Sequence, residues 1–300
     1  MLFTVYDIRA CLYDKKRTNY FAQAIKSVIK KNDVVVDAGS GSGILALLAL
    51  KSGAGRVYAI ESNPRQKKVI LQNAKLNGFD HKIKVIIGDA AKVNLPEPVD
   101  VILCELIHTA TFFEPQMQII NHLKKYLKTG GKTIPRRLYS YVELVSAAEN
   151  FYGLKLSYES REAMAEVAAS NKVKFDEIWF QEDEPLALRT IVKLKATRKT
   201  TVNALRFTGK LMLAKGITLG ATSDLLMPEI IFLQQSLEVV PGKDYFFAIA
   251  YRGGADSLDV KIKHLPKVTP AMIKKCNYLA NNIPTNSLVR PPTRKIHSGG

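Results

Sequence analysis

The segment VVVDAGSGSG at residues 34–43 joins a run of β-branched residues to a glycine-rich loop. Residues 44–50 are apolar and suit a helix, so the segment predicts a buried strand, a tight loop and a helix in succession. Such a loop brings backbone N–H groups close to a bound cofactor, because glycine has no side chain to hold the ligand away.

The spacing of the glycines distinguishes two kinds of cofactor. Gly39, Gly41 and Gly43 follow G-x-G-x-G, whereas dinucleotide sites use G-x-G-x-x-G, and the strand runs into Asp37. A carboxylate there would repel a pyrophosphate but suits a ligand that carries an ammonium and a sulfonium. We therefore predict S-adenosyl-L-methionine as the cofactor, with Asp37, Gly39 and Gly41 at its site.

Acidic residues also follow the next two predicted strands. Glu61 comes 22 residues after Gly39, where a carboxylate can hold both ribose hydroxyls. Asp89, with its neighbour Ala90, follows the third strand and is placed to accept a hydrogen bond from an adenine amino group. Each acid alone could be a helix cap, but three acids at successive strand ends indicate one cofactor site.

The first half of the chain alternates between strands and helices. Such alternation with short loops is typical of a parallel, doubly wound sheet covered on both faces. An amphipathic helix is expected at 18–31, strands at 34–36, 56–60, 83–87 and 99–103, and helices at 44–50, 64–77 and 116–127, the last ending at Thr129-Gly130-Gly131.

After Pro135 the pattern changes to antiparallel strands. Alternating apolar and polar residues predict strands at 138–145, 188–194, 204–213, 230–240 and 245–251, with a helix at 159–170. We therefore divide the chain into an N-terminal helical segment (1–31), a Rossmann-like domain (32–134), a second domain (135–264) and a basic, weakly ordered tail (265–300).

Composition limits the class of protein. The chain has 300 residues, 47% of them hydrophobic and 24% charged, which is typical of a soluble globular protein. No signal peptide or membrane span is predicted, and the widely separated Cys11, Cys104 and Cys276 suggest neither disulfides nor a metal site. A reducing, cytoplasmic location is expected.

The net charge of +17 is concentrated at the two ends of the chain. Residues 1–31 hold seven Lys or Arg against Asp7 and Asp14, and residues 265–300 hold six and no acid. Such segments favour anionic partners, so RNA could bind through them.

Two glutamates, Glu105 and Glu114, lie nine residues apart in the loop after the fourth strand. Loops beyond the carboxyl ends of parallel strands form the ligand crevice, so both would flank the transferable methyl group. Paired carboxylates suit a guanidinium or amine acceptor, which they bind through charge-assisted hydrogen bonds. Cys104 as a nucleophile and His108 as a base are alternatives on the same loop.

These motifs resemble those of the protein arginine methyltransferase family. Its double-glutamate loop has the same separation, and its glycine motif and ribose acid match Asp37–Gly43 and Glu61. Its N-terminal D-x-x-R-T motif is similar to Asp14-Lys15-Lys16-Arg17-Thr18, which implies that Arg17 holds the cofactor carboxylate. The resemblance implies a Rossmann-like class I methyltransferase domain followed by a smaller β-barrel-like domain, and a protein or peptide substrate.

The chain also departs from that family. Asp224-Leu225-Leu226 stands where the family has Thr-His-Trp, and Ala91 stands where it has a glutamate that contacts adenine. The segment that would form the family's dimerisation arm is short or lost, so the resemblance does not carry a dimer with it.

The function we predict is transfer of a methyl group from S-adenosyl-L-methionine to a guanidinium or amine nitrogen, with Glu105 and Glu114 as catalytic residues. An RNA- or ribonucleoprotein-directed methyltransferase that docks through its basic ends is the alternative. A non-enzymatic scaffold that binds the cofactor is a third hypothesis.

Overall fold

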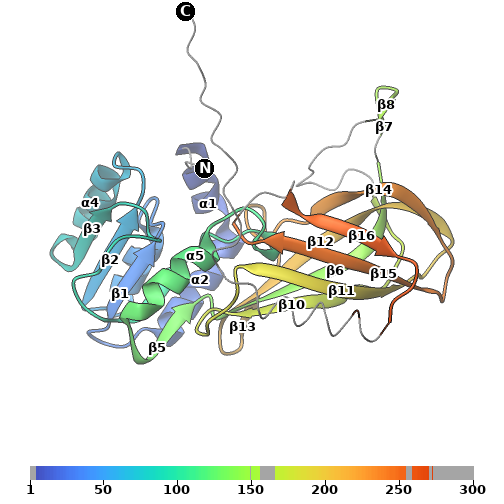
Figure 1. Cartoon of the computed structure of the whole chain (residues 1–300). Coiled ribbons are helices and arrows are strands. Elements are labelled where there is room, and N and C mark those ends of the chain that lie inside the picture. The colour runs from blue at the N-terminus through green and yellow to red at the C-terminus, as the bar shows by residue number, and fades with distance from the viewer. Residues whose placement is uncertain (1–4, 149, 156–165, 255–258, 270–271, 273–300) are drawn as a thin grey trace, which may run out of the picture.

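The computed structural model describes residues 5–148, 150–155, 166–254, 259–269 and 272. A parallel sheet with its helices lies at one end of the molecule and antiparallel strands lie at the other (Figure 1). Among the described helices, none has the length and apolar character needed to cross a membrane.

The first domain is built on a five-stranded parallel sheet of order β3-β2-β1-β4-β5. The chain order reverses between β1 and β4, and the crevice outside the carboxyl ends of the strands at such a reversal is the usual ligand site. The strands are β1 Val34–Ala38, β2 Arg56–Glu61, β3 Ile83–Ile87, β4 Val99–Cys104 and β5 Leu127–Ile134.

Helices flank this sheet, and α2 contacts both domains through α3, β5, β12 and β13. The α-helices are α1 Val5–Tyr13, α2 Lys15–Val28, α3 Ile44–Lys51, α4 Gln66–Leu76 and α5 Gln116–Leu123. Three short 3-10 helices are η1 Asp80–Lys82, η2 Thr109–Thr111 and η3 Lys124–Tyr126.

The helix expected at 116–127 is too long, and the strand that follows it was missed. Leu127–Ile134 forms β5, in which Thr133 and Ile134 pair with Ile102 and Leu103 of β4. In the sequence, Gly130-Gly131 is typical of the turn after a helix, but both glycines lie within β5. The pairing with β4 outweighs the local turn signal, because it buries Ile134 completely.

The second domain consists of antiparallel sheets. One has the order β10-β6-β12-β13, with β14 added to β12 and β9 to β6, and another has the order β11-β15-β16. Together with the parallel sheet, they give the predicted α/β fold with a barrel-like second domain. The strands are β6 Arg137–Ala147, β7 Asn150–Phe151, β8 Leu154–Lys155, β9 Glu166–Ala168, β10 Val173–Trp179, β11 Ala187–Lys195, β12 Thr200–Ala214, β13 Ile217–Leu219, β14 Glu229–Val239, β15 Asp244–Arg252 and β16 Lys261–Leu265.

The helix expected at 159–170 is wrong over its described part. Glu166–Ala168 forms β9 on the edge of β6, and Ser170 forms an isolated bridge with Ala196. Residues 156–165 and most of the predicted tail lie outside the described residues, so the shortened arm and the weakly ordered tail stay predictions.

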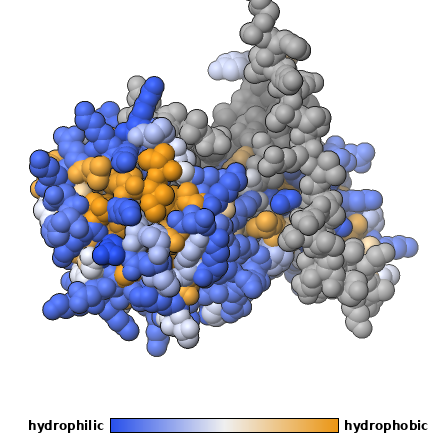
Figure 2. Space-filling model, turned by 60° about the vertical axis from the view of Figure 1, so that its left-hand side comes forward, coloured by the Kyte–Doolittle hydropathy of each residue, from blue (hydrophilic) through white to orange (hydrophobic). Residues whose placement is uncertain are grey.

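Apolar side chains gather on the outer face of the parallel-sheet domain (Figure 2). The exposed large hydrophobic residues of α4 and the edge strand β3 include Val69, Leu71, Leu76 and Ile87. Lysines of α4, including Lys67 and Lys68, are exposed beside them, so this face combines apolar and cationic groups.

Candidate active site

A cavity of about 560 Å³ lies at the carboxyl ends of the parallel strands. Its wall combines α1 and α2, the glycine loop, the loops after β2, β3 and β4, and one residue of the second domain. The predicted site residues in this wall are Arg17, Gly39, Gly41, Glu61, Asp89, Ala90, Glu105 and Glu114.

The glycine loop needs its glycines for two reasons. Gly39, Gly41 and Gly43 all have positive φ, at 77°, 53° and 83°, which other residues adopt only at a cost. A Cβ on Gly39 would lie 2.7 Å from Leu106 Cδ1, and Leu106 lies in the cavity wall. The loop therefore brings its backbone against the cavity without a side chain between.

The Glu61 carboxylate is held by two backbone amides. Glu61 Oε2 accepts a hydrogen bond from Gly41 N–H at 2.8 Å, and Oε1 accepts one from Asn63 N–H at 2.8 Å. These bonds fix the carboxylate at the end of β2 and tie it to the glycine loop. Each oxygen keeps lone-pair capacity toward the cavity, which ribose hydroxyls could use.

Asp37 lies beneath the cavity wall rather than in it. Its side chain is buried, and Oδ2 accepts a hydrogen bond from Ala46 N–H in α3 at 3.2 Å. Burial raises the pKa of the Asp37 carboxyl to about 7, although a hydrogen bond from Ser40 lowers it. Asp37 thus supports the start of α3 from beneath the glycine loop, and its direct contact with the cofactor stays a prediction.

Asp89 lies in the wall, but it already has partners. It accepts a hydrogen bond from Ala91 N–H at 2.9 Å and lies 3.0 Å from Lys92 Nζ. The hydrogen bond with Lys92 is the main cause that holds the pKa of Asp89 below its usual value. The buried Ala90 and its neighbour Ala91 complete this part of the wall.

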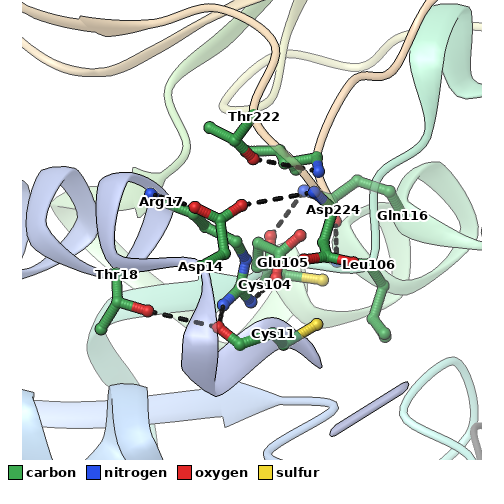
Figure 3. Close-up of polar contacts among 11 residues, drawn as sticks. Cys11, Asp14, Arg17, Thr18, Cys104, Glu105, Leu106, Gln116, Thr222 and Asp224 are labelled. Atoms are coloured by element: carbon green, nitrogen blue, oxygen red, sulfur yellow. Dashed lines mark hydrogen bonds and ion pairs between the residues drawn. The ribbon is translucent and has the colours of Figure 1, made fainter. Parts of the chain in front are cut away.

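Three carboxylates, those of Glu105, Glu114 and Asp224, also line the cavity. Arg17 forms an ion pair with Glu105 and donates from Nη1 to Cys11 O at 3.1 Å (Figure 3). Arg17, which the resemblance assigned to the cofactor carboxylate, is therefore also the partner of a predicted catalytic residue.

Gln116 fixes the backbone on both sides of Glu105. Its Oε1 accepts a hydrogen bond from Leu106 N–H at 2.9 Å, and its Nε2 donates to Cys104 O at 2.7 Å (Figure 3). The side chain is completely buried. Breaking either bond would leave a buried polar group without its partner, which is costly.

The loop that carries both glutamates is anchored in the second domain. Phe112 is completely buried there, edge-to-face with Phe207 at 5.2 Å and with Tyr251 at 4.8 Å. Thr109 Oγ1 donates to Met227 O at 2.6 Å. The antiparallel domain thus sets the position of a loop that begins in the parallel sheet.

The two alternative roles on this loop fit the geometry poorly. Cys104 is completely buried, and burial raises the pKa of its thiol, so a reactive thiolate is disfavoured. His108 does not line the cavity, and its Nε2 lies 3.1 Å from Oε1 of the buried Glu229. Both side chains act as structural parts of the loop.

Two residues of the site are not predicted by sequence pattern. Gln116 carries only a weak signal, a polar residue two positions after Glu114 at the start of a helix. Asp224 differs from the residue that the resembling family has in this loop, but no pattern in the sequence indicates that it lines the cavity. Its backbone N–H donates to Asp14 Oδ2 at 3.3 Å, which joins the loop to α2 (Figure 3).

Sequence comparisons relate the chain to methyltransferases. The family described as the TRM5/TYW2 methyltransferase domain matches residues 2–131. The uncharacterised protein MJ1452 of Methanocaldococcus jannaschii is 32% identical over 253 residues, which cover 84% of this chain and 93% of that protein. The histone-arginine methyltransferase CARMER of Drosophila ananassae is 36% identical over 126 residues, or 41% of this chain and 24% of that protein.

Solved structures share the two-domain fold. A structure of the Trypanosoma brucei PRMT1 enzyme-prozyme heterotetrameric complex with AdoHcy has a TM-score of 0.70 at 19% identity and covers 85% of this chain and 95% of that one. Arabidopsis thaliana protein arginine methyltransferase 10 has a TM-score of 0.70 at 16% identity and covers 82% and 87%.

Fold, site and comparisons together define a class I methyltransferase that uses S-adenosyl-L-methionine and has the architecture of the protein arginine methyltransferases. Within that class, the chain belongs to the family of the M. jannaschii protein MJ1452. A methyltransferase is therefore favoured over a non-enzymatic scaffold that only binds the cofactor.

Gly39→Ala tests the glycine loop. The added Cβ strains the backbone and pushes Leu106 into the cavity, so we expect the affinity for S-adenosyl-L-methionine to fall by at least about tenfold. Isothermal titration calorimetry measures it. Gly216→Ala is the control, since Gly216 also has positive φ but open space around it. Equal affinity in both variants would contradict the close approach.

The raised pKa of Asp37 predicts that the free energy of unfolding depends on pH. The folded chain keeps the Asp37 proton up to about pH 7, whereas the unfolded chain loses it near pH 4, so this group makes stability fall as pH rises between these values. Without cofactor, the free energy of unfolding should fall by about 2 kcal/mol more in the wild type than in Asp37→Asn between about pH 5 and 7. Urea titrations measure the difference, and Asp80→Asn, at an exposed carboxylate, should behave like the wild type. Parallel curves for wild type and Asp37→Asn would refute the assignment.

Proposed function

We propose that this enzyme transfers the methyl group of S-adenosyl-L-methionine to a guanidinium or amine nitrogen of a protein or peptide. One observation carries the proposal. The cavity that the glycine loop lines is also lined by Glu105, Glu114 and Asp224. A wall with three carboxylates and one arginine favours a cationic acceptor.

The cavity residues fit the cofactor. The glycine loop would hold its methionine part, Glu61 would accept from the ribose hydroxyls, and Asp89 and Ala90 would flank the adenine. Arg17 would bind the cofactor carboxylate while it keeps contact with Glu105. When bound, S-adenosyl-L-methionine supplies a methyl group on a positively charged sulfur.

The protein's own residues would orient the acceptor nitrogen and stabilise the positive charge that develops on it. Glu105 and Glu114 would accept hydrogen bonds from the acceptor's N–H groups and direct the remaining nitrogen lone pair at the methyl group. Transfer of the methyl group from sulfur to that nitrogen would make the nitrogen more positive, and the adjacent carboxylates would stabilise that charge. The nitrogen proton would then pass to a carboxylate or to water.

Asp224 would extend the acceptor site beyond the two predicted glutamates. It comes from the second domain, and its backbone is tied to Asp14 at the start of α2. An aspartate there adds a negative charge at the mouth of the acceptor end. We propose that it helps to select a cationic side chain, a role that depends on the proposed chemistry.

Substitution of the two glutamates tests the proposal. In Glu105→Gln and Glu114→Gln, transfer of labelled methyl from S-adenosyl-L-methionine into extract protein should fall by at least about a hundredfold, because each loses a charge next to the developing cation. Scintillation counting after gel separation measures transfer, and acid hydrolysis identifies the methylated amino acid. Cofactor affinity should change by less than about threefold for Glu114→Gln.

Glu97→Gln is the matched control, since Glu97 pairs with Arg56 on the surface away from the cavity wall. It should transfer methyl groups like the wild type. Undiminished transfer by Glu105→Gln and Glu114→Gln would sink the assignment of these residues. Label found in RNA instead of protein would favour the RNA-directed alternative.

A further inference from the structure

The three-stranded sheet β11-β15-β16 presents one face to the core and one to solvent (Figure 1). Phe247 and Ile249 of β15 and Val192 and Leu194 of β11 are buried in the core of the second domain. Because side chains alternate along a strand, their neighbours point outward. The outward residues are Arg189, Ile191, Lys193 and Lys195 on β11, Asp244, Phe246, Ala248, Ala250 and Arg252 on β15, and Lys261, Lys263 and Leu265 on β16.

Strand register makes this face a trough. Ala250 lies between Arg189 and Lys261, and Ala248 lies between Ile191 and Lys263. Small residues on the middle strand thus form a floor, and long cationic side chains on the two outer strands form its sides, roughly 10 Å apart across two strand spacings. We call this surface the basic trough.

The charge of the basic trough is almost entirely positive. Among its outward strand residues, Asp244 is the acid, and it lies 3.4 Å from Lys193 Nζ. Arg189, Lys195, Lys261 and Lys263 are exposed, and the structure gives them no carboxylate partner among the described residues. Uncompensated cations on one face attract a polyanion and release its counterions on binding.

The apolar residues at the floor of the basic trough favour one kind of polyanion over others. Phe246, Ile191 and the two alanines offer an apolar surface with one aromatic ring, which suits the faces of unpaired bases. A duplex would offer this floor only sugar and phosphate, since its bases are stacked inside. An acidic peptide would press backbone N–H and C=O groups against apolar side chains that cannot pair with them.

Spacing also matches a nucleic-acid strand. Lys193 and Lys195, like Lys261 and Lys263, stand two residues apart, or roughly 7 Å along the strand. This repeat is comparable to the distance between successive phosphates of an extended strand. Lysines in such a series can each meet a phosphate.

One end of the basic trough lies near the catalytic cavity. Gly253, which follows β15, accepts a hydrogen bond from Gln118 Nε2 at 2.7 Å, and Gln118 lies in the cavity wall. We propose that the basic trough binds a single-stranded nucleic acid and so brings a ribonucleoprotein substrate to the cavity. The cationic residues of the basic trough belong to neither of the basic ends, residues 1–31 and 265–300.

Fluorescence anisotropy with the full chain and a labelled uridine homopolymer of about 20 nucleotides tests the proposal, without cofactor and at low salt. A quadruple variant that reverses four charges of the basic trough, Arg189→Glu, Lys195→Glu, Lys261→Glu and Lys263→Glu, should bind at least about tenfold more weakly. The slope of log affinity against log salt concentration should fall by about 3. Phe246→Ala should weaken binding by about tenfold, and Phe246→Tyr should restore it.

The matched control reverses four exposed lysines of the other domain, Lys67, Lys68, Lys75 and Lys82, to glutamate. It changes net charge equally and should leave most of the binding intact. Circular dichroism confirms that each variant is folded. Equal losses in the two quadruple variants, tighter binding of a duplex, or equal binding of polyglutamate or anionic vesicles would overturn the proposal. Since no methyl transfer is measured, its failure would leave the proposed function untouched.

Discussion

Burial of Phe112 in the second domain is the constraint on which the position of the loop with Glu105 and Glu114 depends. The loop between Glu105 and Glu114 starts at β4 of the parallel sheet, but Phe112 packs against Phe207 and Tyr251 of the antiparallel domain. Gln116 holds the start of the loop on β4 through both of its amide atoms. Neither domain alone would set the distance between the two carboxylates, so the geometry proposed for catalysis depends on how the two domains pack.

The charged residues of the site lie at different depths, some beneath the glycine loop and others in the cavity wall. Asp37 lies beneath the glycine loop, where burial raises the pKa of its carboxyl and so favours the protonated form. Arg17 and Glu105 pair in the wall, and Glu114 and Asp224 add two further carboxylates to it. The overall charge of +17 therefore says little about the site. The excess cations include those of the basic trough. A substrate that combines an anionic docking part with a cationic acceptor would match both the basic trough and the cavity.

The local part of this account could be predicted from sequence. The glycine loop and β1 to β4 follow from short-range pattern, and Glu61, Glu105 and Glu114 follow from their places after strands. Long-range pairing could not be predicted. β5 contains Gly130-Gly131 and becomes a strand only through β4, and β9 exists only as an edge of β6. Asp224 joins the cavity because α2 holds its backbone, and no local signal reports that contact.

Amide hydrogen exchange over residues 105–113 tests the central claim, that the second domain holds the loop we propose to be catalytic. In Phe112→Ala, exchange at Leu106, Thr111 and Phe113 should accelerate at least about tenfold while β1 and β4 stay protected, and methyl transfer should fall with it. Phe180→Ala, a completely buried phenylalanine outside that contact, is the control for general destabilisation. Unchanged exchange across the loop in Phe112→Ala, with methyl transfer intact, would contradict the claim.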